Sequence, residues 1–323
     1  MIDVKELYKE FKVFQRPDGV WASVKSIFHR EYSIIKAVNG VSFHIDNGEI
    51  VGYVGMNGAG KSTTIKMLSG ILVPSSGSLT VNGIIPYKNR VANAKNIGVV
   101  FGQRSQLYWD LPVIDSFMLH KRLYDIPNDV YAENVKHFTD ILQLGNFIHQ
   151  PVRQLSLGQK MRANIAISLI HNPPVVFLDE PTIGLDIVAK AAIRDFILEI
   201  NKQRGTTFIL TTHDMNDIEH VCQRLILIDK GEIRYDGSLN NFKQSYGEKY
   251  ILTCQIKEFK AVPQSELFYI EEKTDEKKIL LFGDKSKISV SDAVNYVMKA
   301  YEVVDISIQE SNIESILRQI FTQ

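Results

Sequence analysis

The stretch Gly55-Met56-Asn57-Gly58-Ala59-Gly60-Lys61-Ser62 decides how the rest of this sequence is interpreted. It follows an apolar run that predicts a strand and precedes a segment that predicts a helix. Its glycines allow the backbone to curl so that several N–H groups point inward at phosphate oxygens, and the helix adds its positive N-terminal end. Lys61 can then reach the terminal phosphates, and the Ser62 hydroxyl can bind Mg²⁺. The stretch therefore predicts a phosphate-binding loop.

Strand and helix signals alternate from Ala37 onward, a pattern typical of a mostly parallel sheet covered by helices. The segment from Tyr108 to His171 has more helical spacing and predicts a separate helical lobe. Outside the parallel sheet we expect an edge strand over Met1–Tyr8 and a hairpin over Gly77–Gly83. The strands predicted beside the phosphate loop span Ile97–Phe101, Val175–Leu178, Thr207–Thr212 and Leu225–Ile228.

Two acidic residues, Asp179 and Glu180, follow one of these apolar runs directly. Parallel sheets bind ligands at the carboxyl ends of their strands, so we expect both residues near the phosphate loop. One carboxylate can hold a metal through water, and the next, pointing the other way, can polarise an attacking water. Alone such a run is a weak signal, because many strands end in acidic residues. After a phosphate loop it indicates nucleotide hydrolysis.

Two further polar residues follow predicted strands of the same sheet. Gln103 can reach a metal with its neutral amide, and His213 can hydrogen-bond a terminal phosphate or the attacking water. Taken singly both are weak signals, because a histidine after a strand is more often structural.

A short loop, Leu155-Ser156-Leu157-Gly158-Gln159, opens a predicted helix upstream of the acidic strand. The helix belongs to the helical lobe. Its N-terminal dipole and the Ser156 hydroxyl need an anion, which the nucleotide of a second subunit could supply. Two chains facing head-to-tail would then enclose two nucleotides in a closed pair.

In this order, these elements resemble the ATPase subunits of ABC transporters over about residues 1–240. The resemblance implies an α/β fold, a P-loop NTPase of ABC type. It would combine a RecA-like core, an antiparallel β subdomain and a helical lobe over about residues 105–171. It also implies hydrolysis of ATP with Mg²⁺, and a dimer in which each chain completes the other's site.

The resemblance assigns roles residue by residue. Leu157 departs from it, since the family more often has glycine there, but Ser156 and Gly158 keep the phosphate-facing groups. Tyr32 matches the aromatic that stacks on adenine. The implied catalytic residues are Glu180, His213 and Lys61; the metal residues are Ser62, Gln103 and, through water, Asp179; the ATP-binding residues are Tyr32, Gly55, Asn57, Gly58, Ala59, Gly60, Lys61, Ser62, Thr63, Gln103 and Asp179; and Ser156, Gly158, Gln159 and Asp186 contact the partner's ATP.

A finer resemblance is to bacterial ATPases that serve a separate six-helix permease of the export kind. It rests on Phe101–Gln106, on Glu180–Asp186 and on the tail Val303–Phe321. It implies efflux of a drug, sodium or another toxic solute. Two other classes stay open: a soluble ABC ATPase in assembly or translation control, and a nucleotide-gated regulator without hydrolysis, which Glu180 and His213 disfavour. The segment Gln106–Pro112 is either core of the helical lobe or a groove for a permease helix.

Composition and charge limit the partners and the cellular location that we expect for this protein. The 37 Lys and Arg residues balance 37 Asp and Glu residues, so no bulk charge points to nucleic acid. Two cysteines among 323 residues fit a reducing cytosol better than a disulfide framework. No apolar run reaches the roughly 18 residues that span a bilayer. We therefore expect a cytoplasmic chain held at the inner face of the cell membrane by a permease.

Two segments lie outside the main pattern. Residues 12–31 read as an insertion, interpreted as a short helix on its own domain or as an amphipathic contact with lipid or a membrane subunit. After about residue 245, alternating runs and two helical patterns, the second over Ile313–Phe321, predict a small α+β domain. We therefore expect an ATPase domain over residues 1–245 and an accessory, regulatory domain over residues 246–323.

Overall fold

The computed structural model describes residues 1–14, 32–102, 104–212, 214–246, 249–258, 265–273 and 276–310. Most of the insertion, Gln103, His213 and the predicted terminal helix lie outside the described residues. The chain forms two compact units, Met1–Gly237 and Ser238–Gln323. Along the chain the first unit ends a little before the boundary expected at residue 245, and the accessory role of the second unit stays a prediction.

A six-stranded sheet forms the centre of the first unit, with the order β5-β6-β7-β3-β8-β9. The pairs β5–β6, β6–β7, β3–β7 and β3–β8 are parallel. Every residue of β3, β6 and β7 is buried, because helices cover both faces of the sheet. The strands are β3 (Ile50–Gly55), β5 (Ile97–Phe101), β6 (Val175–Asp179), β7 (Thr207–Thr211), β8 (Arg224–Asp229) and β9 (Glu232–Ser238).

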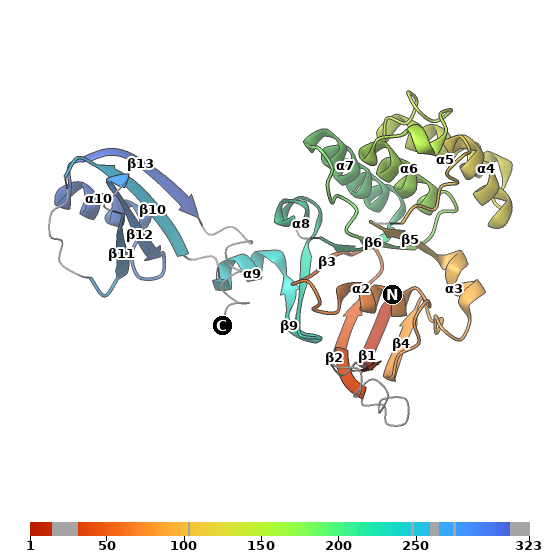
Figure 1. The fold of residues 1–323 in the computed structure, drawn as a ribbon, viewed down its shortest axis with the longest axis horizontal. Coiled ribbons are helices and arrows are strands. Elements are labelled where there is room, and N and C mark those ends of the chain that lie inside the picture. Colours follow the sequence, from red (N-terminus) through yellow and green to blue (C-terminus); the bar gives the residue numbers. More distant parts are fainter. Residues whose placement is uncertain are drawn as a thin grey trace, which may run out of the picture. The chain divides into compact units, whose positions relative to one another are not determined.

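Helices lie on both sides of this sheet, with α2 on one side and α6 and α7 on the other (Figure 1). The sheet register aligns the strand ends, since Asp179 pairs with Phe101 on one side and with Thr211 on the other. Residues that follow these strands are therefore delivered to one edge. The helices that flank the sheet are α2 (Lys61–Leu68), α3 (Arg90–Asn96), α6 (Leu157–Leu169), α7 (Ile187–Arg204) and α8 (Met215–Val221).

A separate antiparallel sheet of the first unit has the order β2-β1-β4. Its strands are β1 (Ile2–Phe14), β2 (Tyr32–Ile45) and β4 (Ser76–Val81). One sequence expectation was wrong here, because the N-terminal strand is central rather than at the edge. Over Gly77–Gly83, β4 pairs with β1 and ends in a tight turn that an antiparallel bridge between Val81 and Ile84 closes. The local alternation of a strand does not reveal neighbours that arrive later in the chain.

The helical lobe is built by α4 (Val113–Leu123), α5 (Asn128–Ile141), a 3₁₀ turn (Val152–Gln154) and α6. Prolines stand immediately before α4 and α5, where a missing N–H is tolerated. The lobe packs on the core through the rings of Phe138 in α5 and Phe196 in α7, whose centroids are 5.1 Å apart in a T-shaped arrangement.

The second unit is an antiparallel sheet with the order β11-β12-β10-β13. Its core joins side chains of β10, β11 and β12 to α10, among them Tyr250, Leu252, Ala293 and Val297. The strands predicted in this region are present. The elements are α9 (Leu239–Tyr246), β10 (Lys249–Ile256), β11 (Phe268–Lys273), β12 (Lys278–Asp284), α10 (Val290–Ala300) and β13 (Val303–Glu310).

Neither cysteine forms a disulfide, and both are buried. Burial raises the pKa of the Cys222 thiol and brings that of Cys254 to about 11, so both stay protonated and unreactive at neutral pH. Within the described part of the chain, no helix has the length and apolar character needed to cross a membrane.

Candidate functional site

The phosphate loop has the backbone that its glycines permit. Gly58 and Gly60 adopt left-handed φ values of 82° and 108°. A Cβ atom at Gly60 would lie 2.3 Å from the Ala37 carbonyl oxygen, and one at Gly55 would lie 2.2 Å from the Ile228 carbonyl oxygen. Gly58 instead faces open space. The loop thus contacts neighbouring backbone at Gly55 and Gly60 and is open at Gly58. This leaves a concave surface at the start of α2.

The side chain of Lys61 is folded into this loop. Its residue is only 6% exposed, and its ammonium donates to the carbonyl oxygens of Gly55 at 2.6 Å and Met56 at 3.0 Å. Burial lowers the pKa of Lys61, while the charges of Glu180 and Asp179 act to raise it. A cation therefore lies within the curl of the loop, at the place where phosphate charge is expected.

The Asp179 carboxylate faces the first turn of α2. Its Oδ1 accepts hydrogen bonds from the Ser62 hydroxyl at 3.1 Å and from the Thr211 hydroxyl at 2.6 Å. Asp179 and Thr211 are both buried. The contact with Ser62 joins the phosphate-loop helix to the end of β6, and Thr211 holds the carboxylate from the neighbouring strand.

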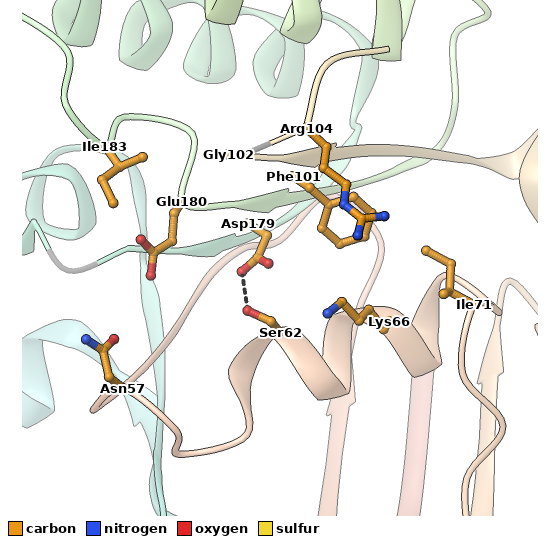
Figure 2. A pocket seen from close by; sticks show the side chains of 10 residues that line it. All are labelled: Asn57, Ser62, Lys66, Ile71, Phe101, Gly102, Arg104, Asp179, Glu180 and Ile183. Atoms are coloured by element: carbon orange, nitrogen blue, oxygen red, sulfur yellow. Dashed lines mark hydrogen bonds between the residues drawn. The ribbon is translucent and has the colours of Figure 1, made fainter.

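Glu180 continues the chain directly from this carboxylate, with a left-handed backbone at φ 56°. Its N–H donates to Thr211, to the carbonyl oxygen at 2.9 Å and to the hydroxyl at 3.2 Å. The two acidic side chains point in different directions: in Figure 2 Asp179 points to Ser62 at the start of α2, and Glu180 lies on the side of Asn57.

A cavity of about 520 Å³ opens between these groups (Figure 2). Carboxylates form one wall, cations stand opposite, and a hydroxyl lies between them. Oxygen ligands of this kind are what Mg²⁺ prefers, and the cationic loop beside them suits phosphates, so the residues fit a magnesium nucleotide. The lining residues are Asn57, Ser62, Lys66, Ile71, Phe101, Gly102, Arg104, Asp179, Glu180 and Ile183.

The loop that opens α6 is organised as a capping box. The Ser156 hydroxyl accepts from the Gln159 N–H at 3.3 Å, and the Gln159 side chain accepts from the Ser156 N–H at 2.8 Å. Such reciprocal capping fixes the start of the helix and keeps its N-terminal N–H groups together.

The start of α7 lies against this loop. A Cβ atom at Gly158 would lie 3.2 Å from the Ala189 Cβ and 4.0 Å from the Asp186 carboxylate, which caps α7 through the Ala189 N–H at 2.8 Å. Leu157, the departure from the family pattern, is half exposed. These residues form a second group, and none of them is among the described residues that line the cavity.

The expected adenine-stacking residue, Tyr32, begins β2, is 52% exposed and is not among the residues that line the cavity, so its role stays a prediction. Gln103 and His213 lie outside the described residues, so their expected roles stay predictions.

Sequence reasoning missed Thr211, Phe101, Lys66 and Arg104. The last three line the cavity, and Thr211 holds Asp179 in place. A polar Thr211 at the end of an apolar strand was a readable signal. The inward position of Lys66 and Arg104 could not be predicted, because it depends on how α2 packs against the sheet.

Comparisons with known proteins agree with this geometry. Residues 38–183 match the family described as "ABC transporter". The chain is similar to the ABC transporter ATP-binding protein NatA of Bacillus subtilis (strain 168), with 32% identity over 68% of this chain and 88% of that protein. It is also similar to the linearmycin resistance ATP-binding protein LnrL of the same organism, with 32% identity over 68% of this chain and 70% of that protein.

A third relative covers more of the chain. The methionine import ATP-binding protein MetN 2 of Enterococcus faecalis (strain ATCC 700802 / V583) is 28% identical over 90% of this chain and 86% of that protein. Among solved structures, a dimeric post-hydrolysis ATP-binding cassette bound to ADP and Pi superposes with a TM-score of 0.62 and 24% identity. It covers 74% of this chain and 99% of that one, a likeness that establishes the fold.

Proposed function

Because this chain belongs to the family of ABC transporter ATP-binding proteins, we propose that it powers the export of a solute through a separate permease. The family makes the chain an ATPase that uses ATP with Mg²⁺. The observation that carries the chemistry is the Asp179 carboxylate, joined to Ser62 of the phosphate loop and followed at once by Glu180.

Within this site each residue has a definite task. The loop N–H groups and Lys61 hold the phosphates, and Ser62 and Asp179 hold the metal, Asp179 through water. Mg²⁺, when bound, neutralises phosphate charge. Glu180 orients the attacking water and accepts its proton. Gln103 and His213 are assigned to the metal and to the terminal phosphate, respectively, on the strength of the motif alone.

The residues at the starts of α6 and α7 support a functional dimer of two ATPase chains. Ser156, Gly158, Gln159 and Asp186 stand together but do not line the cavity. A capped helix N-terminus is a site for an anion, and a second chain would bring its ATP there. Loss of the bridging phosphate on hydrolysis would open the pair and supply the motion that transport needs.

Exposed apolar side chains support a membrane partner. Tyr108 and Trp109 are 50% and 60% exposed, whereas Leu107 beside them is buried. The core interpretation of Gln106–Pro112 thus holds only for Leu107, and its neighbours offer a surface for a permease helix. A resistance protein among the relatives favours export, whereas another relative is an importer. Held by its permease, the chain would lie at the inner face of the membrane.

The test is co-purification. The tagged chain, extracted from membranes in mild detergent, should bring down an integral membrane protein with about six spans, identified by mass spectrometry. A variant with Tyr108→Ala and Trp109→Ala should lose that protein, whereas Val91→Ala, which removes an exposed apolar side chain elsewhere, should keep it. Recovery of the chain without a membrane protein would contradict the proposal and favour a soluble ABC ATPase.

A further inference from the structure

A buried hydroxyl–carboxylate contact lies behind the segment that carries Glu180. The Thr182 hydroxyl donates to Oδ2 of Asp217 at 2.5 Å, and both residues are at most 3% exposed. Thr182 lies in the turn after β6, and Asp217 lies in the first turn of α8. The contact therefore joins the turn that follows Glu180 to the helix that follows the β7 strand.

Cations of α7 face the same carboxylate cluster. Arg194 lies 3.6 Å from Oδ1 of Asp217, and Lys190 forms an ion pair with Asp214, the residue that caps α8. Both cations belong to α7, the helix that Asp186 caps. These contacts connect three segments: the turn after Glu180, helix α7 and the start of α8.

Glu180 needs such support because its backbone is strained. A non-glycine residue with a left-handed φ persists only where the surroundings hold it from more than one side. Thr211 holds the Glu180 N–H from β7. On the other side the turn closes through the Leu185 N–H, which donates to the Thr182 carbonyl oxygen at 3.2 Å. The Thr182 side chain then anchors this turn to Asp217.

We infer that Asp217 is a positioning residue for hydrolysis: it holds Thr182, and through it fixes the backbone that aims Glu180 into the cavity. The inference rests on the proposed role of Glu180 as the base. An apolar pair would pack as well as Thr182 and Asp217, without the cost of burying a charge. Burial raises the pKa of Asp217, and Oδ1 makes no hydrogen bond among the described residues, its nearest cation being Arg194 at 3.6 Å, so burying this carboxylate costs stability.

The test compares two substitutions of Thr182 in the purified full-length chain. Thr182→Val keeps the shape and removes the hydroxyl, so kcat for ATP should fall on the order of tenfold to hundredfold while KM changes by less than about twofold. Thr182→Ser keeps the hydroxyl and should restore most of kcat. Thr139→Val is the matched control, because the Thr139 hydroxyl is buried without a hydrogen-bond partner among the described residues, and kcat should not change.

A second variant addresses the partner. Asp217→Leu should lower kcat as Thr182→Val does, and the double variant should be no worse than the single ones, because both remove one contact. Binding of a fluorescent ATP analogue and the thermal unfolding midpoint show whether each variant is folded.

Three results would overturn the inference: wild-type kcat in Thr182→Val, failure of Thr182→Ser to rescue, or a rise in KM with kcat unchanged. If the unsubstituted chain does not hydrolyse ATP, the proposed function itself is wrong. If it does and Thr182→Val matches it, only the positioning role fails.

Discussion

The two units of this chain differ in the direction of neighbouring strands in their main sheets. In the first, neighbouring central strands run parallel, so Gly55, Asp179 and Thr211 reach the same edge of the sheet. In the second, neighbouring strands run in opposite directions, so consecutive strand ends fall at opposite edges. Polar groups gather in the first unit, whereas the second has an apolar core against α10. Strand direction, more than composition, decides which unit can build a phosphate site.

A tightly packed glycine has a different role in each of the two units. A Cβ atom at Gly55 would meet a backbone carbonyl oxygen, and one at Gly283 would lie 2.2 Å from the ring of Tyr250. Both positions exclude a side chain. In the first unit the exclusion shapes a loop that binds a ligand, whereas in the second it makes room for a core aromatic. Substitutions that change ATP turnover should therefore lie in the first unit, whereas substitutions in the second unit should change only its stability.

The largest effect should come from Glu180→Gln in the first unit. Removal of the base should lower ATP turnover by about 10²–10⁴-fold while ATP binding persists, because the phosphate loop is untouched. Turnover is measured by phosphate release, and a stable ATP-bound dimer is checked by size-exclusion chromatography. The same change at Glu271, which is exposed on β11, should have no effect. Wild-type turnover in Glu180→Gln would remove the assignment of the base.

Acid should weaken the first unit through His171. Its ring stacks on Tyr124 with centroids 4.1 Å apart, and Nε2 donates to the Ile97 carbonyl oxygen at 3.1 Å. Burial, and then the nearby His120, lower the pKa of His171 from 6.5 to about 4. Between those values the unfolded chain binds a proton that the folded one does not. Stability is thus complete above pH 6.5 and declines as pH falls toward 4, by about 3 kcal/mol.

Hydrogen exchange at pH 7 and pH 4.5 measures this loss for each unit separately. Protection of β5 and α6 should fall with acid in the unsubstituted chain. His171→Asn keeps a donor for the Ile97 carbonyl oxygen but does not titrate in this range, so its acid loss should be smaller. An equal loss in both proteins would show that another group is responsible.

Sequence reasoning succeeded where one local pattern determines the local structure. The phosphate loop, the acidic end of β6 and the start of the helix after Ser156 each contain their own turn, strand or helix signal. It failed where the partner comes from elsewhere: β1 is central because β2 and β4 arrive later in the chain. The Thr182–Asp217 contact depends on how α8 packs against the turn that follows β6, which no local pattern encodes.

A smaller effect is expected from Gly283→Ala. The added methyl would collide with Tyr250, so the second unit should lose about 1–3 kcal/mol of stability while ATP turnover stays at the wild-type rate. Gly145→Ala in the first unit is the control, because its nearest neighbour would be 3.9 Å away. Hydrogen exchange of β10 and β12 reports the change. Loss of turnover in Gly283→Ala would mean that the units are not independent.

The smallest effect should follow removal of residues 247–323. The deleted stretch contains an entire hydrophobic cluster, from Tyr250 to Ile306, so the first unit keeps its own core. The affinity for a fluorescent ATP analogue should then change by less than about twofold. Failure of the shortened chain to bind ATP would contradict the division into an ATPase domain and an accessory domain.

The folded position of Lys61 has a consequence for ligand choice. Before a nucleotide arrives, its ammonium is satisfied by the carbonyl oxygens of Gly55 and Met56. A ligand must therefore compete with two existing hydrogen bonds of the ammonium, and a strong anion competes best for a cation so held. The loop thereby discriminates against nucleosides, which carry the base and sugar but no phosphate charge, before any contact with the base is made.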